Sequence, residues 1–212
     1  MAFALRSILS LLSLAVLLGA ASAAADAIEF DFKDPKGVNA MYFVLDSTLE
    51  PIMGLASGIS GKVKFDPAKP EGMTGGIKVD AASLHIEHKG MKDHLRGPDW
   101  LDVEKYPNID FAFKKVTDVK KGADSAVEMK VTGDFTCHGV TKEITIPVTA
   151  NYLKGKLGER LRDKQGDLLV LRSNFSIKRK DFGIKPSMGN DVVAENIEIR
   201  VSIVGVAPAS GK

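Results

Sequence analysis

Apolar and polar residues alternate with a period of two along most of this 212-residue chain. In the clearest run, residues 127–137, the odd positions are apolar or small and the even positions are polar. Because successive side chains of a strand point to opposite faces, this pattern predicts strands that are buried on one face. The same alternation is found at 143–150, 197–203, 77–79 and 109–113, and in the groups Met41, Phe43 and Leu45; Val63 and Phe65; and Leu171, Phe175 and Ile177.

These runs predict about eight antiparallel strands in one domain, because none of them is the continuous apolar run of a parallel sheet. Strands of this kind either pack as two sheets or close into a barrel, and periodicity alone does not choose between the two. Pro147 falls on a polar position of its run. Since proline cannot donate a hydrogen bond to the ladder, we expect an edge or a splayed region there.

One stretch, residues 89–101, breaks the alternation. It reads KGMKDHLRGPDWL, with two apolar residues four positions apart and a following Gly-Pro pair that ends any helix. We therefore expect a short helix near residues 90–97, laid across one end of the barrel. Trp100 and Tyr106 flank this segment and are expected to anchor it to the strands.

The first residues have the features of a secretory signal peptide. Arg6 supplies a positive charge, residues 8–18 are almost wholly apolar, and small residues follow. We expect a signal peptide over residues 1–25, cleaved after Ala23 or Ala25, and a mature domain over residues 26–212 in the periplasm or outside the cell. An uncleaved membrane anchor is the alternative, although the apolar stretch is short for a bilayer.

The charges of the chain are nearly balanced, with 29 Lys and Arg against 27 Asp and Glu. A nucleic-acid partner would need a basic excess, so we expect none. Cys137 is the only cysteine, which leaves no intramolecular disulfide and makes a buried core the source of stability. Its position in the run groups it with Phe135 and opposite His138, which predicts a buried, unreactive thiol.

Three segments resemble, in the same order, the YceI-like family of periplasmic polyisoprenoid-binding proteins. They are residues 94–111 (HLRGPDWLDVEKYPNIDF), 133–142 (GDFTCHGVTK) and 177–184 (IKRKDFGI). The likeness extends from about residue 60 onward. It implies an all-β fold: an antiparallel, up-and-down, eight-stranded, lipocalin-like β-barrel whose interior takes a long isoprenoid tail.

The chain departs from that family near its N-terminus. Lys36-Gly37 and Ser47 stand near the places where the family usually has a His-Ser pair and a second His, and Pro51 interrupts the turn that follows. These changes leave the barrel intact. They leave open the polar contacts at its mouth, and with them the identity of the ligand.

If the inward faces line a tunnel for such a lipid, the alternation selects its wall. The residues expected there are Phe43, Phe65, Val79, Phe111, Phe113, Met129, Phe135, Ile146, Phe175, Ile199 and Val201. The polar end of the ligand would be held by His94, Arg96 or Arg179.

Arg179 has two interpretations, because it shares the inward parity of Ile177 and lies near the end of its strand. An Arg fork there suits a phosphate or another polar head. The preferred alternative is a structural pair with Asp181, Glu195 or Asp99, which would compensate the buried charge.

The histidines at 85, 88 and 94 could suggest a metal site, since imidazole is a common metal ligand. Residues three apart on a strand face opposite sides, however, and no CxxC or HExxH pattern is present. We therefore expect surface or hydrogen-bonded histidines, and neither a metal nor another cofactor.

The sequence thus predicts a non-enzymatic binding protein that sequesters or carries a polyisoprenoid or another long-chain amphipathic lipid. It would meet membranes only through lipid exchange, and a homodimer is compatible with the sequence. One alternative is a ligand-free stress-response or interaction protein with a filled barrel. A less favoured one is a hydrolase or isomerase acting on a lipid, for which no paired nucleophile and base is found.

Overall fold

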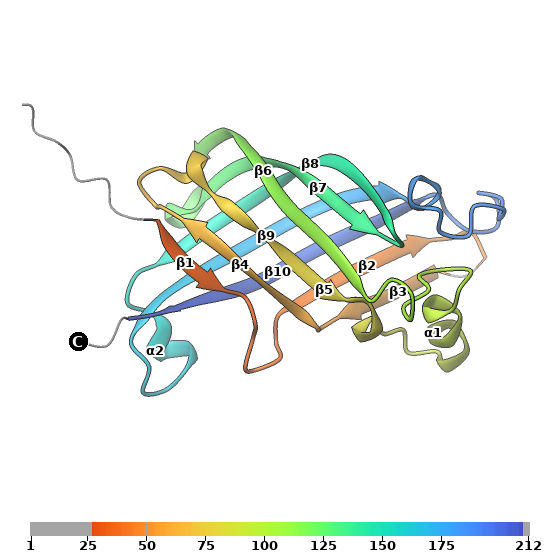
Figure 1. Ribbon diagram of the computed structural model, residues 1–212, viewed down its shortest axis with the longest axis horizontal. Coiled ribbons are helices and arrows are strands. Elements are labelled where there is room, and N and C mark those ends of the chain that lie inside the picture. Colours follow the sequence, from red (N-terminus) through yellow and green to blue (C-terminus); the bar gives the residue numbers. More distant parts are fainter. Residues whose placement is uncertain (1–26, 50, 210–212) are drawn as a thin grey trace, which may run out of the picture.

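The alternating runs form antiparallel strands that wrap around one apolar interior, in a computed structural model that describes residues 27–49 and 51–209 (Figure 1). The expected signal peptide lies outside these residues. The strands are β1 (Ile28–Asp31), β2 (Ala40–Asp46), β3 (Pro51–Ala56), β4 (Ile59–Phe65), β5 (Thr74–Asp80), β6 (Asn108–Lys121), β7 (Val127–Cys137), β8 (Val140–Leu153), β9 (Gly166–Lys178) and β10 (Asn196–Pro208). The α-helices are α1 (Lys89–Arg96) and α2 (Leu157–Arg160), and four short 3₁₀ turns lie at Pro70–Gly72, Ala81–Ser83, Ala123–Ser125 and Arg179–Phe182.

The ten strands form an eight-stranded barrel, because two of the eight barrel strands are each split into two parts, β1 with β2 and β3 with β4. β1 and β2 pair with different parts of the same strand, β10, through Asp31 opposite Val206 and Ala40 opposite Ser202. β4 pairs with β1, and β3 pairs with β2. Every other strand pairs with its neighbours in the sequence, so the predicted antiparallel, up-and-down, closed barrel is confirmed.

The strand β3 corrects one expectation from the sequence. Pro51 does not interrupt a turn but begins this strand. A proline is tolerated at the first position of a strand, where its missing N–H is not needed by the ladder. β1 and β3 are also the strands that the alternation did not single out, since each is only a short part of a split barrel strand.

The strand β7 shows how closely the alternation follows burial. Its bounds, Val127–Cys137, are those of the clearest run, and Met129, Val131, Phe135 and Cys137 are buried. The polar residues between them are exposed or half-buried. One-sided burial of this kind is what a barrel with a packed interior requires.

The strands β8 and β9 are joined along only part of their length. Their register covers Thr149–Leu153 opposite Leu168–Arg172, and Pro147 lies just beyond it. The splayed region predicted from Pro147 is therefore confirmed. Ser173 still links the two strands there, since its Oγ donates a hydrogen bond of 2.6 Å to the carbonyl oxygen of Pro147.

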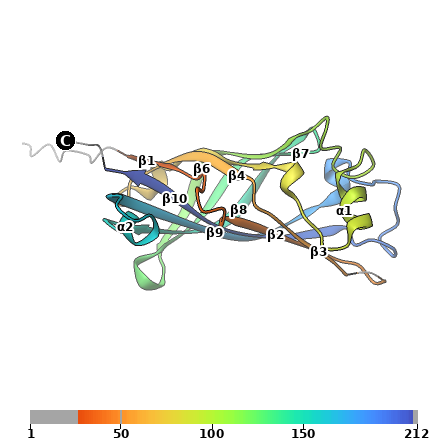
Figure 2. The same cartoon turned by 90° about the horizontal axis from the view of Figure 1, so that it is seen from below.

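The helices α1 and α2 lie at opposite ends of the barrel (Figures 1 and 2). The α2 end is closed by packed side chains, because Phe32 and Leu157 are fully buried there. Arg160 reaches back from α2 to Asp34, with 2.9 Å between its Nη2 and the carboxylate. Asn39 joins this group and donates hydrogen bonds to the carbonyl oxygens of Phe32 and Val204.

The opposite end carries α1, whose bounds confirm the helix expected near residues 90–97. His88 caps it, since its Nδ1 accepts a hydrogen bond from the Met91 N–H. In the part of the chain that the structure describes, no helix combines the length and the apolar character needed to cross a membrane.

Candidate ligand-binding cavity

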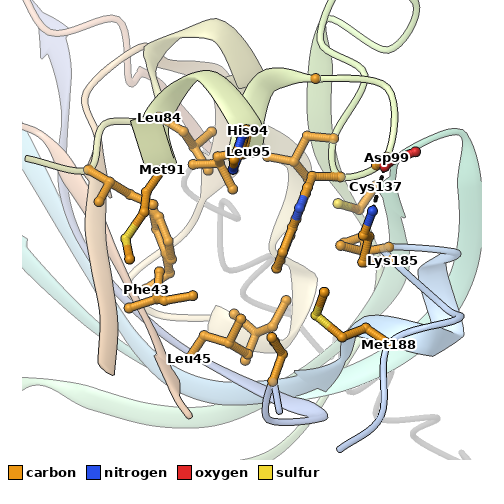
Figure 3. A pocket seen from close by; sticks show the side chains of 18 of the residues that line it. Phe43, Leu45, Leu84, Met91, His94, Leu95, Asp99, Cys137, Lys185 and Met188 are labelled. Atoms are coloured by element: carbon orange, nitrogen blue, oxygen red, sulfur yellow. Dashed lines mark hydrogen bonds and ion pairs between the residues drawn. The ribbon is translucent and has the colours of Figure 1, made fainter. Parts of the chain in front are cut away.

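A cavity of about 800 Å³ opens at the α1 end of the barrel (Figure 3). Its wall combines inward residues of the strands with residues of α1 and of the segments that cap this end. Figure 3 shows Leu84, Met91 and Leu95 on the α1 side, across from Phe43 and Leu45 on the barrel wall. The remaining apolar lining includes Ile109, Trp100, Phe135, Cys137, Ile177, Ile184, Met188, Val193, Ile197 and Ile199.

The cavity brings together three of the residues predicted for the wall, Phe43, Phe135 and Ile199. The others lie elsewhere in the interior and do not line it: Phe65, Val79, Phe111, Phe113, Met129, Ile146, Phe175 and Val201. The alternation assigns a residue to the inward face, but it says nothing about depth along the barrel axis. The cavity therefore occupies one end of the barrel instead of running along all the inward faces.

The polar groups of the lining gather at the rim. Lys185 and Asp99 form an ion pair that joins two separate segments, and this pair is drawn in Figure 3. The hydrogen bond from Lys185 lowers the pKa of the Asp99 carboxyl below its ordinary value. His94 also lines the cavity, as does Asp93. Of the three residues predicted to meet a polar head, His94 is the one placed in the lining.

Arg96 holds the helix α1 in place. Its Nη2 donates hydrogen bonds to the carbonyl oxygens of Ala82 and Leu84, while the cavity is lined by residues on either side of it, Leu95 and Gly97. The guanidinium therefore fixes α1 against the segment after β5.

Arg179 is fully buried and does not line the cavity. Its guanidinium donates to the carbonyl oxygens of Ala194 at 3.0 Å, Met188 at 2.6 Å and Val193 at 3.2 Å, and also to those of Ile184 and Lys185. These carbonyls all belong to the loop between β9 and β10.

The partners expected for Arg179 are engaged differently. Asp181 pairs with Lys142 and Asp99 pairs with Lys185, while Glu195 offers its backbone carbonyl to the N–H of Arg179. The interpretation as a structural residue holds, but backbone carbonyls replace the predicted carboxylates. Arg179 thereby shapes the 184–195 loop, which supplies Ile184, Lys185, Met188 and Val193 to the cavity.

Ser47 ties the end of β2 to the same loop. It is buried, and its Oγ accepts a hydrogen bond from the Ala194 N–H at 3.2 Å while donating to the carbonyl of Leu45. Ser47 therefore supports the rim that it also lines.

The two aromatic residues beside α1 have different roles. Trp100, expected only to anchor its segment, lines the cavity. Tyr106 does anchor: its ring stands edge-on to His138, with 5.1 Å between ring centroids, and packs against Gly139. Met91, Leu95 and Trp100 cap the cavity, and the alternation of the strands does not select them. The sequence signal for them is the helical spacing of Met91 and Leu95, next to an apolar strand end.

Cys137 is buried, as predicted from its grouping with Phe135. Burial raises the pKa of its thiol to about 12, so the group is a neutral thiol at physiological pH. Although Cys137 lines the cavity, a neutral buried thiol behaves as a small apolar residue.

The histidines outside the cavity have local roles. The Nε2 of His85 lies 3.6 Å from the carboxylate of Glu87, and His88 caps α1. Among residues 27–49 and 51–209, no three His, Cys, Asp or Glu side chains are grouped so as to hold a metal ion.

The chain is similar to known proteins in both sequence and fold. The family profile described as a YceI-like domain matches residues 27–205. A UPF0312 protein of Pseudomonas putida is 32% identical over 155 residues, which cover 73% of this chain and 73% of that protein. The crystal structure of Burkholderia cenocepacia BcnA is similar with a TM-score of 0.64 and 25% identity, covering 78% of this chain and 95% of that one.

A polyisoprenoid binding domain from Saccharophagus degradans, described as implicated in plant cell wall breakdown, has a TM-score of 0.60 to this chain. The alignment covers 87% of this chain and all of that domain. At 14% identity, this likeness concerns the fold alone.

Proposed function

The chain belongs to the YceI-like family, and from this membership and its cavity we propose that it binds an isoprenoid or another amphipathic lipid inside the barrel. The observation that carries the proposal is the apolar cavity of about 800 Å³ at the α1 end. Burial of apolar surface contributes about 25 cal/mol per Å², so a hydrocarbon tail can bind there with few polar contacts. The segments 94–111, 133–142 and 177–184, which resemble the YceI-like family of polyisoprenoid-binding proteins, support an isoprenoid as the tail.

The placement of polar groups sets the orientation of the ligand. Phe135 and Ile199 line the cavity from the barrel wall, whereas Asp99 and Lys185 belong to the rim, with Asp99 largely exposed. An amphiphile therefore enters tail first and keeps its polar end near Lys185 and His94, in contact with water.

The chemistry of the lining favours binding over catalysis. Cys137 is held as a neutral thiol, and the Lys185 ammonium is neutralised by Asp99. Nucleophilic catalysis needs an activated nucleophile beside a base. Neither the neutral thiol of Cys137 nor the paired ammonium of Lys185 is activated in this way. We propose a carrier or sequestering protein in place of a hydrolase or isomerase.

The leader-like N-terminus supports a proposed location in the periplasm or outside the cell. N-terminal sequencing of exported protein should find the chain beginning at Ala24 or Asp26. Recovery of intact Met1 in the membrane fraction would contradict this location.

Binding can be measured through Trp100, because it is the only tryptophan of the chain and lines the cavity. Titration with farnesol should change its fluorescence until one site is saturated. Phe43→Asn should weaken binding roughly tenfold to a hundredfold, since it places an amide against the tail at about 1–3 kcal/mol. Phe43 is buried in the lining.

The matched control is Tyr42→Asn, because Tyr42 is the neighbouring aromatic residue and points outward from β2. It should leave the affinity unchanged, and thermal melts of both variants would exclude unfolding. Equal affinities of the two folded variants would remove the cavity as the binding site. If the wild type bound no lipid at all, a ligand-free interaction protein would become the better account.

A further inference from the structure

We infer that the cavity accepts an isoprenoid chain of about twenty carbon atoms and excludes the part of any longer chain beyond that length. The inference rests on the proposed lipid-binding function and specifies its ligand class: a compact amphiphile, with a chain-length limit set by the barrel interior. Three features of the structure carry it: the depth at which the lining ends, the aromatic residues at that depth, and the packing beyond them.

The lining ends within about one inward position on several strands, and it reaches furthest on β2, where Met41 is paired with Val201. The last lining residues on β6, β7, β9 and β10 are Ile109, Phe135, Ile177 and Ile199. The next inward positions away from the mouth are Phe111, Gly133, Phe175 and Val201, and none of these lines the cavity. Lining Phe135 is paired with Phe111, and lining Ile199 with Phe175, so lining and non-lining residues meet at this depth and form the floor of the cavity.

That floor is aromatic, with Phe135 at its centre. The centroid of the Phe135 ring lies 6.4 Å from that of Phe111 and 6.1 Å from that of Phe175. The contact with Phe175 is edge-on. Contacts of this kind stabilise the rings beyond the area that they bury, so the floor resists displacement by a flexible tail.

Much of the interior beyond the floor is packed, while Phe113 and Val201 are partly buried. Phe30, Val63, Phe65, Val131 and Ile203 are all at most 1% exposed. At the far end, Leu157 of α2 is fully buried. A tail that passed the floor would have to displace several of these side chains, and overpacking of a well-packed core costs about 1–3 kcal/mol for each extra group.

The volume sets the length. A cavity of about 800 Å³ has room for roughly 27 groups of the size of a water molecule, each of about 30 Å³, and we use this as an order-of-magnitude guide to the number of non-hydrogen atoms it holds. A twenty-carbon isoprenoid alcohol has about 21, and a forty-five-carbon one about 46, by the same count of non-hydrogen atoms. The first fits with its hydroxyl at the rim, and the second does not.

The test is a series of linear isoprenoid alcohols of ten, fifteen, twenty and forty-five carbons, titrated against the wild-type protein with Trp100 fluorescence as the signal. Each added isoprene unit should tighten binding by on the order of a hundredfold to a thousandfold up to twenty carbons. Between twenty and forty-five carbons the gain should be less than about twofold, because the extra chain stays in water.

A variant locates the limit. Phe175→Ala removes about six carbon atoms from the floor, roughly the size of one isoprene unit. In this variant the affinity should keep rising for one isoprene unit beyond twenty carbons. The matched control is Phe65→Ala, which removes the same atoms from the packed half, where Phe65 is 1% exposed. It should leave the length limit unchanged.

The outcomes separate the two claims. An affinity that keeps rising to forty-five carbons would overturn the length limit and leave lipid binding intact. Failure of every alcohol to bind would count against the proposed function itself. The wild-type series decides the limit even if neither Phe→Ala variant folds.

Discussion

The Nδ1 of His138 lies 3.0 Å from the carbonyl oxygen of Phe182, across 44 positions of the chain. The ring of Tyr106 stands edge-on to the ring of His138, which lies in the turn between β7 and β8. The three residues come from the three segments that resemble the YceI-like family, so those segments meet in one contact at the barrel mouth. The motifs thus hold β7, the 3₁₀ turn at 179–182 and the segment after α1 together, and this contact fixes the frame of the cavity.

This contact predicts an effect of Gly139→Ala. Gly139 has φ of +74°, and an added Cβ would lie 2.4 Å from the Tyr106 ring. The left-handed backbone costs an alanine about 1–2 kcal/mol, and the clash adds about 1–3 kcal/mol. Chemical denaturation should therefore show a loss of unfolding free energy of roughly 2–5 kcal/mol, the sum of these two costs.

Gly155→Ala is the matched control, because Gly155 has φ of +70° with nothing near an added Cβ. It should show only the backbone cost. Equal losses in the two variants would mean that the Tyr106 contact contributes nothing.

Removal of the Arg179 guanidinium should release the loop between β9 and β10. Arg179→Met leaves the carbonyls of Met188, Val193 and Ala194 without their donor. We expect a loss of about 3–5 kcal/mol in unfolding free energy, because several buried acceptors lose their hydrogen bonds together. Arg179→Lys should not restore it, since an ammonium cannot reach the same set of carbonyls.

The comparison for this variant is Arg200→Met, at an exposed position of β10. Its effect should stay within about 0.5 kcal/mol, as for most surface changes. A small loss in Arg179→Met, similar to that in Arg200→Met, would contradict the role of Arg179 as the support of the 184–195 loop.

The ion pair of Asp99 and Lys185 should control how fast a ligand leaves. It joins the segment after α1 to the 184–195 loop at the rim. Asp99→Asn should raise the dissociation rate of farnesol severalfold in stopped-flow fluorescence, with little change in stability because the Asp99 carboxylate is largely exposed. Asp134→Asn, which breaks the pair with Lys114 on the outer wall, should leave the rate unchanged.

Acid should reproduce the effect of Asp99→Asn. Folding lowers the pKa of the Asp99 carboxyl below its ordinary value of 3.8, because Lys185 donates a hydrogen bond to it. The contribution of the pair is thus present above that value and is lost as the pH falls below it. A dissociation rate that began to rise at neutral pH would point to a group other than Asp99.

Cys137 should resist thiol reagents in the folded protein. Burial raises its pKa to about 12 from 9.0, so labelling at pH 8 should be roughly a thousandfold slower than in denaturant. Because folding raises this pKa, the stability that comes from burying the neutral thiol is complete below pH 9 and is lost as the pH rises toward 12.

Cys137→Ala should cost on the order of 1 kcal/mol through a small void. It should leave farnesol binding within about threefold, because a methyl group keeps the wall apolar. Rapid labelling of the folded protein at pH 8 would show that the thiol is not buried.

The sequence by itself determined which face is buried in the eight strands that the alternation singled out. Side chains alternate along a strand for local, steric reasons, so Met129, Val131 and Cys137 could be assigned to the interior without any knowledge of their partners. Pro147 likewise predicted the splay of β8 from β9, because the missing N–H is a property of one residue. The closed barrel followed from the resemblance to the YceI-like family, whose ordered segments the chain carries.

Only the tertiary structure decided how deep the cavity runs and which residues cap it. Depth along the barrel depends on how rings from different strands meet, as Phe111, Phe135 and Phe175 do at the floor. The partners of Arg179 are backbone carbonyls of a loop that follows it, and carbonyls leave no trace in the sequence. Alternation is local, whereas a cavity is the space left between segments that are distant in the chain, and its shape exists only once they pack.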